Sequence, residues 1–197
     1  NSIYSIGYMR AKKESHQTRF YVCFALAIFG AMGVAMAGNM FTLFICYEVL
    51  TITTYPLVTH AGTPDAMRSG RTYLGLLLGS SIGLQLAAII GTWYLTGTLD
   101  FRDGGVFAGH VQGPVIGLLL FLYMYGIGKA ALMPIHRWLP AAMVAPTPVS
   151  ALLHAVAVVK AGVFTVLKVI VYLFGSDFLR ESGYGDWLAY IAGATVL

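Results

Sequence analysis

Long apolar runs, separated by short polar segments rich in glycine and proline, set the pattern of this 197-residue chain. A transmembrane helix needs about 20 predominantly apolar residues. Five runs approach that length: residues 20–37, 41–60, 73–95, 115–133 and 148–174. A sixth run, from Trp187 to Leu197, is about half as long as required. The pattern predicts an all-α, polytopic transmembrane bundle of five spans plus part of a sixth, with residues 1–197 as a single membrane domain from a longer subunit.

Composition and charge distribution agree with that prediction. Hydrophobic residues make up 58% of the chain and charged residues 10%, against about 25% charged residues in soluble domains. Cationic residues favour cytoplasmic loops, and most of them fall on one side of the predicted bundle: Arg10, Lys12, Lys13, Arg19, Arg68, Arg71 and Arg137. The net charge of +4 therefore reflects topology and contact with anionic lipid head groups. It does not indicate nucleic-acid binding.

Four charged residues remain inside the predicted spans: Glu48, Lys129, Lys160 and Lys168. A lysine at bilayer depth costs about 2.5 to 3.5 kcal/mol, so such residues usually accompany water, a counter-charge or an ion pathway. Glu48 and Lys160 lie near the middle of their spans, whereas Lys129 lies near one end. Lys129 becomes central only if its helix breaks at Pro134, which lacks a backbone donor. We expect that break, followed by a short helix over residues 136–145 at membrane depth.

The simplest chemistry for these residues is a switched proton store. Desolvation weakens the hold of a lysine on its proton, and a nearby carboxylate strengthens it. Moving Glu48 relative to Lys129 would therefore load or release a proton. Widening such a pair from about 4 to about 8 Å removes about 2 kcal/mol at an effective dielectric constant of about 20. We expect the two side chains to face each other in the bundle. A static ion pair that joins two helices is the alternative.

Histidines could relay protons, because they titrate near neutral pH. His136 lies at the expected break and His154 precedes Lys160 by six residues, so each is a candidate for the proton path or for an interhelical hydrogen bond. His60 and Lys168 lie nearer the ends of their spans, and Lys168 could snorkel toward the membrane surface. No histidine has the spacing of a metal site. No phosphate loop or cysteine cluster indicates a cofactor.

Two further patterns have structural interpretations. Aromatic residues near the ends of spans are predicted to lie in interfacial belts: Trp93, Tyr94 and Trp138. Glycines at four-residue spacing favour close contact between helices in a membrane: Gly75, Gly79 and Gly83.

Three motifs carry a resemblance to a known family: GKAALMPIHRWLPAAM at residues 128–143, APTPVSALLH at 145–154 and VKAGVF at 159–164. Together with Tyr47-Glu-Val-Leu, they resemble the antiporter-like, proton-translocating membrane subunits shared by respiratory complex I, energy-converting hydrogenases and Mrp-type cation/proton antiporters. The sequence around His154 and Lys160 is most similar to that of the D-type subunit of Mrp antiporters.

The resemblance implies a role for each buried charge. Glu48 would be the glutamate of the family's fifth helix, Lys129 the lysine of its broken seventh helix and Lys160 the central lysine of its eighth. Residues 18–175 would form the first of two inverted five-helix repeats. Such subunits carry no cofactor and no redox chemistry of their own. The implied partners are other integral membrane subunits, the lipid bilayer, protons and, in the antiporters, Na⁺.

Function therefore has three interpretations at this point. The first is a proton-translocating subunit of a multi-subunit cation/proton antiporter in a prokaryotic cytoplasmic membrane, acting through Glu48, Lys129 and Lys160. The second is a proton-pumping subunit in the membrane arm of an NADH-quinone oxidoreductase or a hydrogenase. The third is a membrane scaffold that moves no protons, in which the buried charges only pair.

Overall fold

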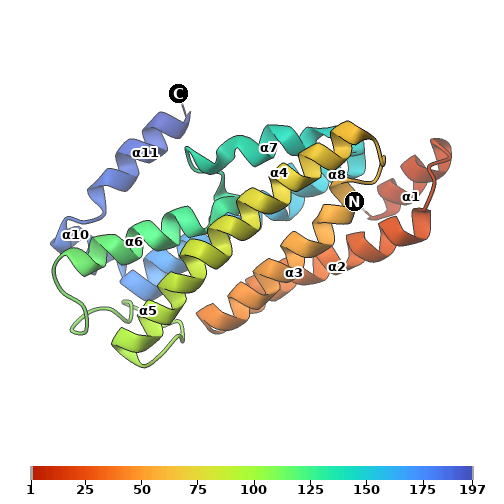
Figure 1. Ribbon diagram of the computed structural model, residues 1–197. Coiled ribbons are helices and arrows are strands. Elements are labelled where there is room, and N and C mark those ends of the chain that lie inside the picture. The colour runs from red at the N-terminus through yellow and green to blue at the C-terminus, as the bar shows by residue number, and fades with distance from the viewer. Residues whose placement is uncertain (1, 197) are drawn as a thin grey trace.

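The computed structural model describes residues 2–196 and places most of them in helices (Figure 1). Within that range, four helices are long and apolar enough to cross a membrane. They are α2 (Gln17–Met36), α3 (Met40–Val58) and two composite helices, Pro64–Thr96 and Thr147–Phe174. A shorter apolar helix, α6, covers Pro114–Gly126. The prediction of an all-α, multi-pass membrane bundle is confirmed.

Both composite helices contain wide π-type turns. The first consists of α4 (Pro64–Ser80), a π-turn (Ser81–Gln85) and α5 (Leu86–Thr96). The second consists of α8 (Thr147–Ala151), a π-turn (Leu152–Val156), α9 (Val158–Lys168) and a final π-turn (Val169–Phe174). A π-turn shifts the angular register of all side chains that follow it, and such turns are frequent at functional sites.

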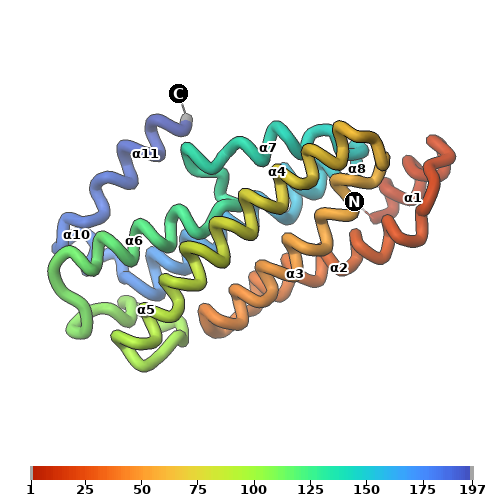
Figure 2. Tube along the Cα trace, in the orientation of Figure 1, coloured from red at the N-terminus to blue at the C-terminus, as the bar shows by residue number. Residues whose placement is uncertain are grey.

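Short helices complete the bundle: α1 (Ser2–Ala11), α7 (Trp138–Ala141), α10 (Ser176–Ser182) and α11 (Asp186–Val196). Helix α1 lies at the same end of the bundle as α8, and the Thr147 hydroxyl donates to the Tyr8 hydroxyl at 3.3 Å. Helices α10 and α11 lie at the opposite end, as the Cα trace shows (Figure 2).

Helices α2 and α3 form an antiparallel hairpin. Asn39 begins α3 by accepting a hydrogen bond from the Thr42 backbone N–H at 2.8 Å, so the tight turn expected there is present. Gly30 lets the two backbones approach, because a Cβ at this position would lie 3.0 Å from the Leu50 nitrogen. This close approach brings the buried face of α3, which carries Tyr47, into the centre of the bundle.

The expected helix break near Pro134 is present, but it begins earlier, at the end of α6. Helix α6 ends at Gly126, and Lys129 lies in the short 3₁₀ turn Gly128–Ala130 that follows. Side chains at the two glycines are excluded by tertiary packing, because a Cβ on Gly126 would overlap the Gln85 backbone. One on Gly128 would overlap the Ser80 hydroxyl. The break therefore begins at two glycines against which the first composite helix packs.

Two smaller predictions also need correction. Trp138 is fully buried rather than interfacial, since its ring packs edge-on against Tyr73. Trp93 and Tyr94 are exposed at the end of α5, as a belt position requires. The three spaced glycines make no close helix contact within the described residues, because a Cβ on any of them would meet nothing within 4 Å: Gly75, Gly79 and Gly83. Their face of the first composite helix is open.

Helix α9 packs on the break through Gly162, where a Cβ would overlap backbone atoms of Lys129 and Ala130. We predict that Gly162→Val lowers the thermal unfolding midpoint of the full-length protein, because overpacking costs about 1–3 kcal/mol. Gly79→Ala is the matched control. It adds a methyl group in open space and favours the helix, so it should leave the midpoint unchanged or raise it. Equal midpoints for Gly162→Val and wild type would contradict this packing.

Candidate functional site

Lys129 is fully buried in the break and is held mainly by one residue of α3, Tyr47. The Lys129 ammonium donates to the Tyr47 carbonyl at 2.6 Å and lies over the Tyr47 ring, 3.0 Å from its centroid. The Lys129 backbone N–H donates to the Tyr47 hydroxyl at 3.0 Å. Thr51, one turn further along α3, accepts a third hydrogen bond from the ammonium at 2.6 Å. Every described hydrogen-bond acceptor of the ammonium is therefore a neutral group.

The backbone of the break is fixed from two other sides. The buried Trp138 indole donates to the Gly128 carbonyl at 2.9 Å, which ties the segment after the break back to its beginning. Gly162 of α9 covers the Lys129–Ala130 peptide on the other side. Irregular backbone at membrane depth requires such enclosure, because lipid offers no hydrogen bonds. The enclosure keeps the ammonium at one point between α3 and the broken helix.

Glu48 follows Tyr47 on α3, and both of its carboxylate oxygens are buried with no hydrogen-bond partner in the described chain. The one ion pair shorter than 4.0 Å among residues 2–196 joins Arg180 to Asp177 on the surface, so Glu48 and Lys129 are not in direct contact. The ammonium nevertheless lies against Tyr47, the residue that directly precedes Glu48 on α3. The Glu48 carboxylate and the Lys129 ammonium therefore lie in the same region of the bundle without forming an ion pair.

Hydroxyl groups extend this region along α3. Thr54, one turn beyond Thr51, shares a hydrogen bond of 2.5 Å with the Tyr73 hydroxyl of α4. Both residues are fully buried. Tyr73 in turn packs against Trp138, so the hydroxyl pair lies next to the segment that follows the break. These hydroxyls can donate or accept a hydrogen bond, as transfer of a proton between neighbours requires.

Gln85 is a buried polar residue that the sequence analysis missed. Its side chain is fully buried and neither amide atom has a hydrogen-bond partner in the described chain. It ends the π-turn of the first composite helix and lies against Gly126, the last residue of α6. Two turns further on, Thr92 and Tyr123 share a buried hydrogen bond of 2.7 Å. A lone glutamine in the middle of a long apolar run was the available signal.

Lys160 lies on a different face of α9 from the one that packs against the break. Gly162 faces the break, and two residues correspond to about 200° on a helix, so Lys160 points away from Lys129. Its side chain is exposed and lines a groove of about 280 Å³ between α2 and α9, whose other lining residues are apolar, among them Val34 and Phe164. His154 lies on the preceding π-turn, with its Nε2 atom buried and without a partner. The described chain does not join Lys160 to the Glu48 and Lys129 region.

The other three candidate residues, His136, His60 and Lys168, lie in separate parts of the bundle. His136 lies in the turn before Trp138, with a buried Nδ1 that has no partner. His60 follows the end of α3 and packs on Phe20; burial lowers its pKa, and the Arg19 charge adds to that effect. Lys168 donates to the Ala37 carbonyl at 2.6 Å, at the end of α2. That last bond is typical of a helix-capping lysine.

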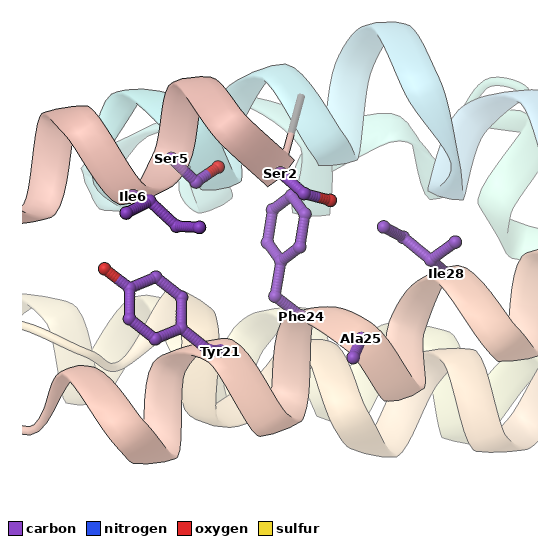
Figure 3. Close-up of a pocket in the computed structure, with 7 residues that line it drawn as sticks. All are labelled: Ser2, Ser5, Ile6, Tyr21, Phe24, Ala25 and Ile28. Carbon is purple, nitrogen blue, oxygen red and sulfur yellow. The ribbon is translucent and has the colours of Figure 1, made fainter.

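A cleft of about 300 Å³ between α1 and α2 is separate from these residues (Figure 3). Tyr21 of α2 faces Ile6 of α1 across it, and Phe24 points toward Ser2. Its lining contains no charged side chain: Ser2, Ser5, Ile6, Tyr21, Phe24, Ala25 and Ile28. The buried ammonium of Lys129, the buried carboxylate of Glu48 and several buried hydroxyls lie instead on α3 and at the break.

Comparison with known proteins places this arrangement in context. The chain is 33% identical over 187 residues to NADH-quinone oxidoreductase subunit L of Neisseria meningitidis, covering 84% of this chain and 26% of the relative. It is 34% identical over 204 residues to the A/B-type subunit of a probable K(+)/H(+) antiporter of Rhizobium meliloti, covering 100% of this chain and 19% of the relative. The chain thus spans about a quarter or less of the length of these two relatives.

The fold of this chain is also similar to that of a solved structure. The Mrp complex from Dietzia sp. DQ12-45-1b matches with a TM-score of 0.63 and 29% identity, covering 75% of this chain and 16% of the matched chain. The antiporter relative from Rhizobium meliloti is of the A/B type, so the D-type likeness stays a prediction. Residues 37–197, which include Glu48, Lys129 and Lys160, match the model of one membrane family. The chain therefore belongs to the family described as NADH:quinone oxidoreductase/Mrp antiporter, TM.

Proposed function

We propose that this chain is the proton-conducting part of a membrane subunit in which Lys129 holds and releases a proton under the control of Glu48. The observation that carries the proposal is the buried Lys129 ammonium, whose described hydrogen-bond acceptors are a neutral carbonyl and a neutral hydroxyl. Charged side chains at this depth pair with an opposite charge or with backbone carbonyls, and Lys129 has the second kind of partner. Glu48, the nearby carboxylate, is buried and unpaired instead.

The separation of these two groups makes their interaction adjustable. At an effective dielectric constant of about 20, bringing opposite charges from about 8 to about 4 Å gains about 2 kcal/mol. That amount changes a proton-binding constant about thirtyfold. A small movement of α3 relative to the break would therefore load Lys129, and the reverse movement would unload it. Tyr47 and Thr51 supply acceptors that hold the side chain in place in both states.

Lys160 would act as a second station outside this pair. It lies in the open groove between α2 and α9, at bilayer depth and with apolar neighbours. An exposed ammonium there requires a polar partner from elsewhere in the subunit or its complex. His154 and His136, each with an unpartnered buried ring nitrogen, are proposed to serve proton transfer between such stations. Lys168 and His60 are the peripheral members of the set.

The parent assembly is a cation/proton antiporter in this proposal, in a prokaryotic cytoplasmic membrane and with other integral membrane subunits as partners. A second candidate is the membrane arm of a respiratory redox complex. It is supported by the similar identity of this chain to an NADH-quinone oxidoreductase subunit, 33%, and to an antiporter subunit, 34%. Dependence of proton movement on Na⁺ or K⁺ separates the two.

The test is proton uptake by vesicles that contain the full parent complex, at matched assembly. We predict that Lys129→Ala and Glu48→Gln each lower uptake about tenfold or more, because positioned proton-transfer groups contribute factors of about 10² or more. Lys129→Arg is the decisive variant. Arginine keeps the charge but does not release its proton, so a proton carrier loses activity whereas a scaffold keeps it. Full uptake by an assembled Lys129→Arg complex would overturn the proposal.

Gln85 gives a second prediction, in which stability and transport change in opposite directions. Burying its amide without a hydrogen bond costs about 1–3 kcal/mol, so Gln85→Leu should raise the thermal unfolding midpoint of the full-length protein. If the amide interacts with the transferred proton or its water at the break, the same variant should lower proton uptake several-fold. Leu120→Met, in the buried face of α6, is the control for core substitution. A stabilised variant with unchanged uptake would make Gln85 structural.

A further inference from the structure

A basic groove lies on the outer face of the bundle, beside the segment that follows the break. It has a volume of about 520 Å³ and lies between α4 and the turn Ile135–Arg137. Its lining consists of Arg71, Thr72, Gly75, Leu76 and Arg137. Both arginines are exposed, neither has an ion-pair partner within residues 2–196, and no acidic residue lines the groove. Two cationic side chains from different elements therefore share one groove without a counter-charge.

The length of the composite helix indicates the depth of this groove. Pro64–Thr96 contains 33 residues, which extend about 50 Å at about 1.5 Å per residue. The hydrocarbon core is about 30 Å thick, so a centred helix projects about 10 Å beyond it at each end. Arg71, seven residues after Pro64, then lies about 10 Å from the helix start, at the boundary between head groups and hydrocarbon. Gly75 and Leu76 lie about one turn deeper.

The groove thus combines two guanidinium groups at head-group depth with an apolar floor below them. Guanidinium groups bind phosphate oxygens in a bidentate manner. Gly75 leaves open space, because a Cβ there would meet nothing within 4 Å, and Leu76 adds an apolar surface. A soluble anion would use only the upper half of such a groove. A phospholipid would use both halves, with its phosphate between the arginines and the start of an acyl chain against Gly75 and Leu76.

We propose that this groove is a binding site for an anionic phospholipid, such as phosphatidylglycerol, on the side of the membrane where basic residues concentrate. Basic pockets between transmembrane helices on that side suit anionic head groups. The bound phosphate would join α4 to the segment after the break, because Arg71 and Arg137 come from these two elements. Arg137 precedes Trp138, whose indole holds the Gly128 carbonyl. The lipid would therefore brace the broken helix from outside.

The test is lipid retention by the full-length parent protein in nanodiscs that contain phosphatidylcholine with a minority of phosphatidylglycerol. Native mass spectrometry then counts the lipids that stay bound after release. Wild type should retain phosphatidylglycerol in preference to phosphatidylcholine. Arg71→Gln and Arg137→Gln should each reduce that preference about fivefold, and the double variant about 25-fold, which is the contribution typical of basic residues at an anionic surface.

Two controls keep the result interpretable. Arg68→Gln removes an exposed arginine one turn earlier on α4 that does not line the groove, so it should leave the preference unchanged. The double variant Arg71→Lys and Arg137→Lys keeps both charges but not the bidentate geometry, so its preference should lie between those of wild type and the double glutamine variant. An equal loss in Arg68→Gln and Arg71→Gln would overturn the proposal. So would no preference in wild type, or a protein subunit filling the groove in the parent complex.

Discussion

The ammonium of Lys129 lies inside the bundle with a backbone carbonyl, a hydroxyl and an aromatic ring as its neighbours. Keeping a cationic group there requires acceptors and a gap in regular helix, and the surrounding elements supply both. Tyr47 contributes its carbonyl, ring and hydroxyl. Glycines 126, 128 and 162 let the first composite helix and α9 approach the broken backbone. Since lipid cannot satisfy irregular backbone, the break and the lysine depend on the same enclosure.

The buried charges could be found from the sequence because charged residues are rare in apolar runs. Glu48 and Lys129 stood out for that reason, and so did the existence of a break. The early start of the break could not be predicted, because Pro134 is a visible local signal whereas the approach of Gln85 to Gly126 is a tertiary contact. Trp138 was predicted wrongly for the same reason. A tryptophan near the end of a span suggests the membrane–water interface, but the Trp138 indole donates to the Gly128 carbonyl inside the bundle.

The depth of Lys160 could be predicted from the sequence, but the direction of its side chain could not. Its depth follows from counting residues along the span, but the direction of its side chain depends on the π-turn at Leu152–Val156 and on which face of α9 packs against the break. Neither is visible in hydropathy. Lys160 faces the α2 and α9 groove as a result. Gln85 was not singled out, because an uncharged amide in an apolar helix usually forms an interhelical hydrogen bond. Only the structure shows that its amide has no hydrogen-bond partner in the described chain.

The coupling between Glu48 and Lys129 is the centre of the account, and infrared difference spectroscopy of the full-length protein tests it most directly. Spectra recorded before and after proton uptake should differ by a carboxyl band that Glu48→Gln removes. The account predicts that Lys129→Ala weakens or removes the change in this band during proton uptake, because Glu48 and Lys129 would act as one pair. A Glu48 band that changes identically with and without Lys129 during proton uptake would contradict it.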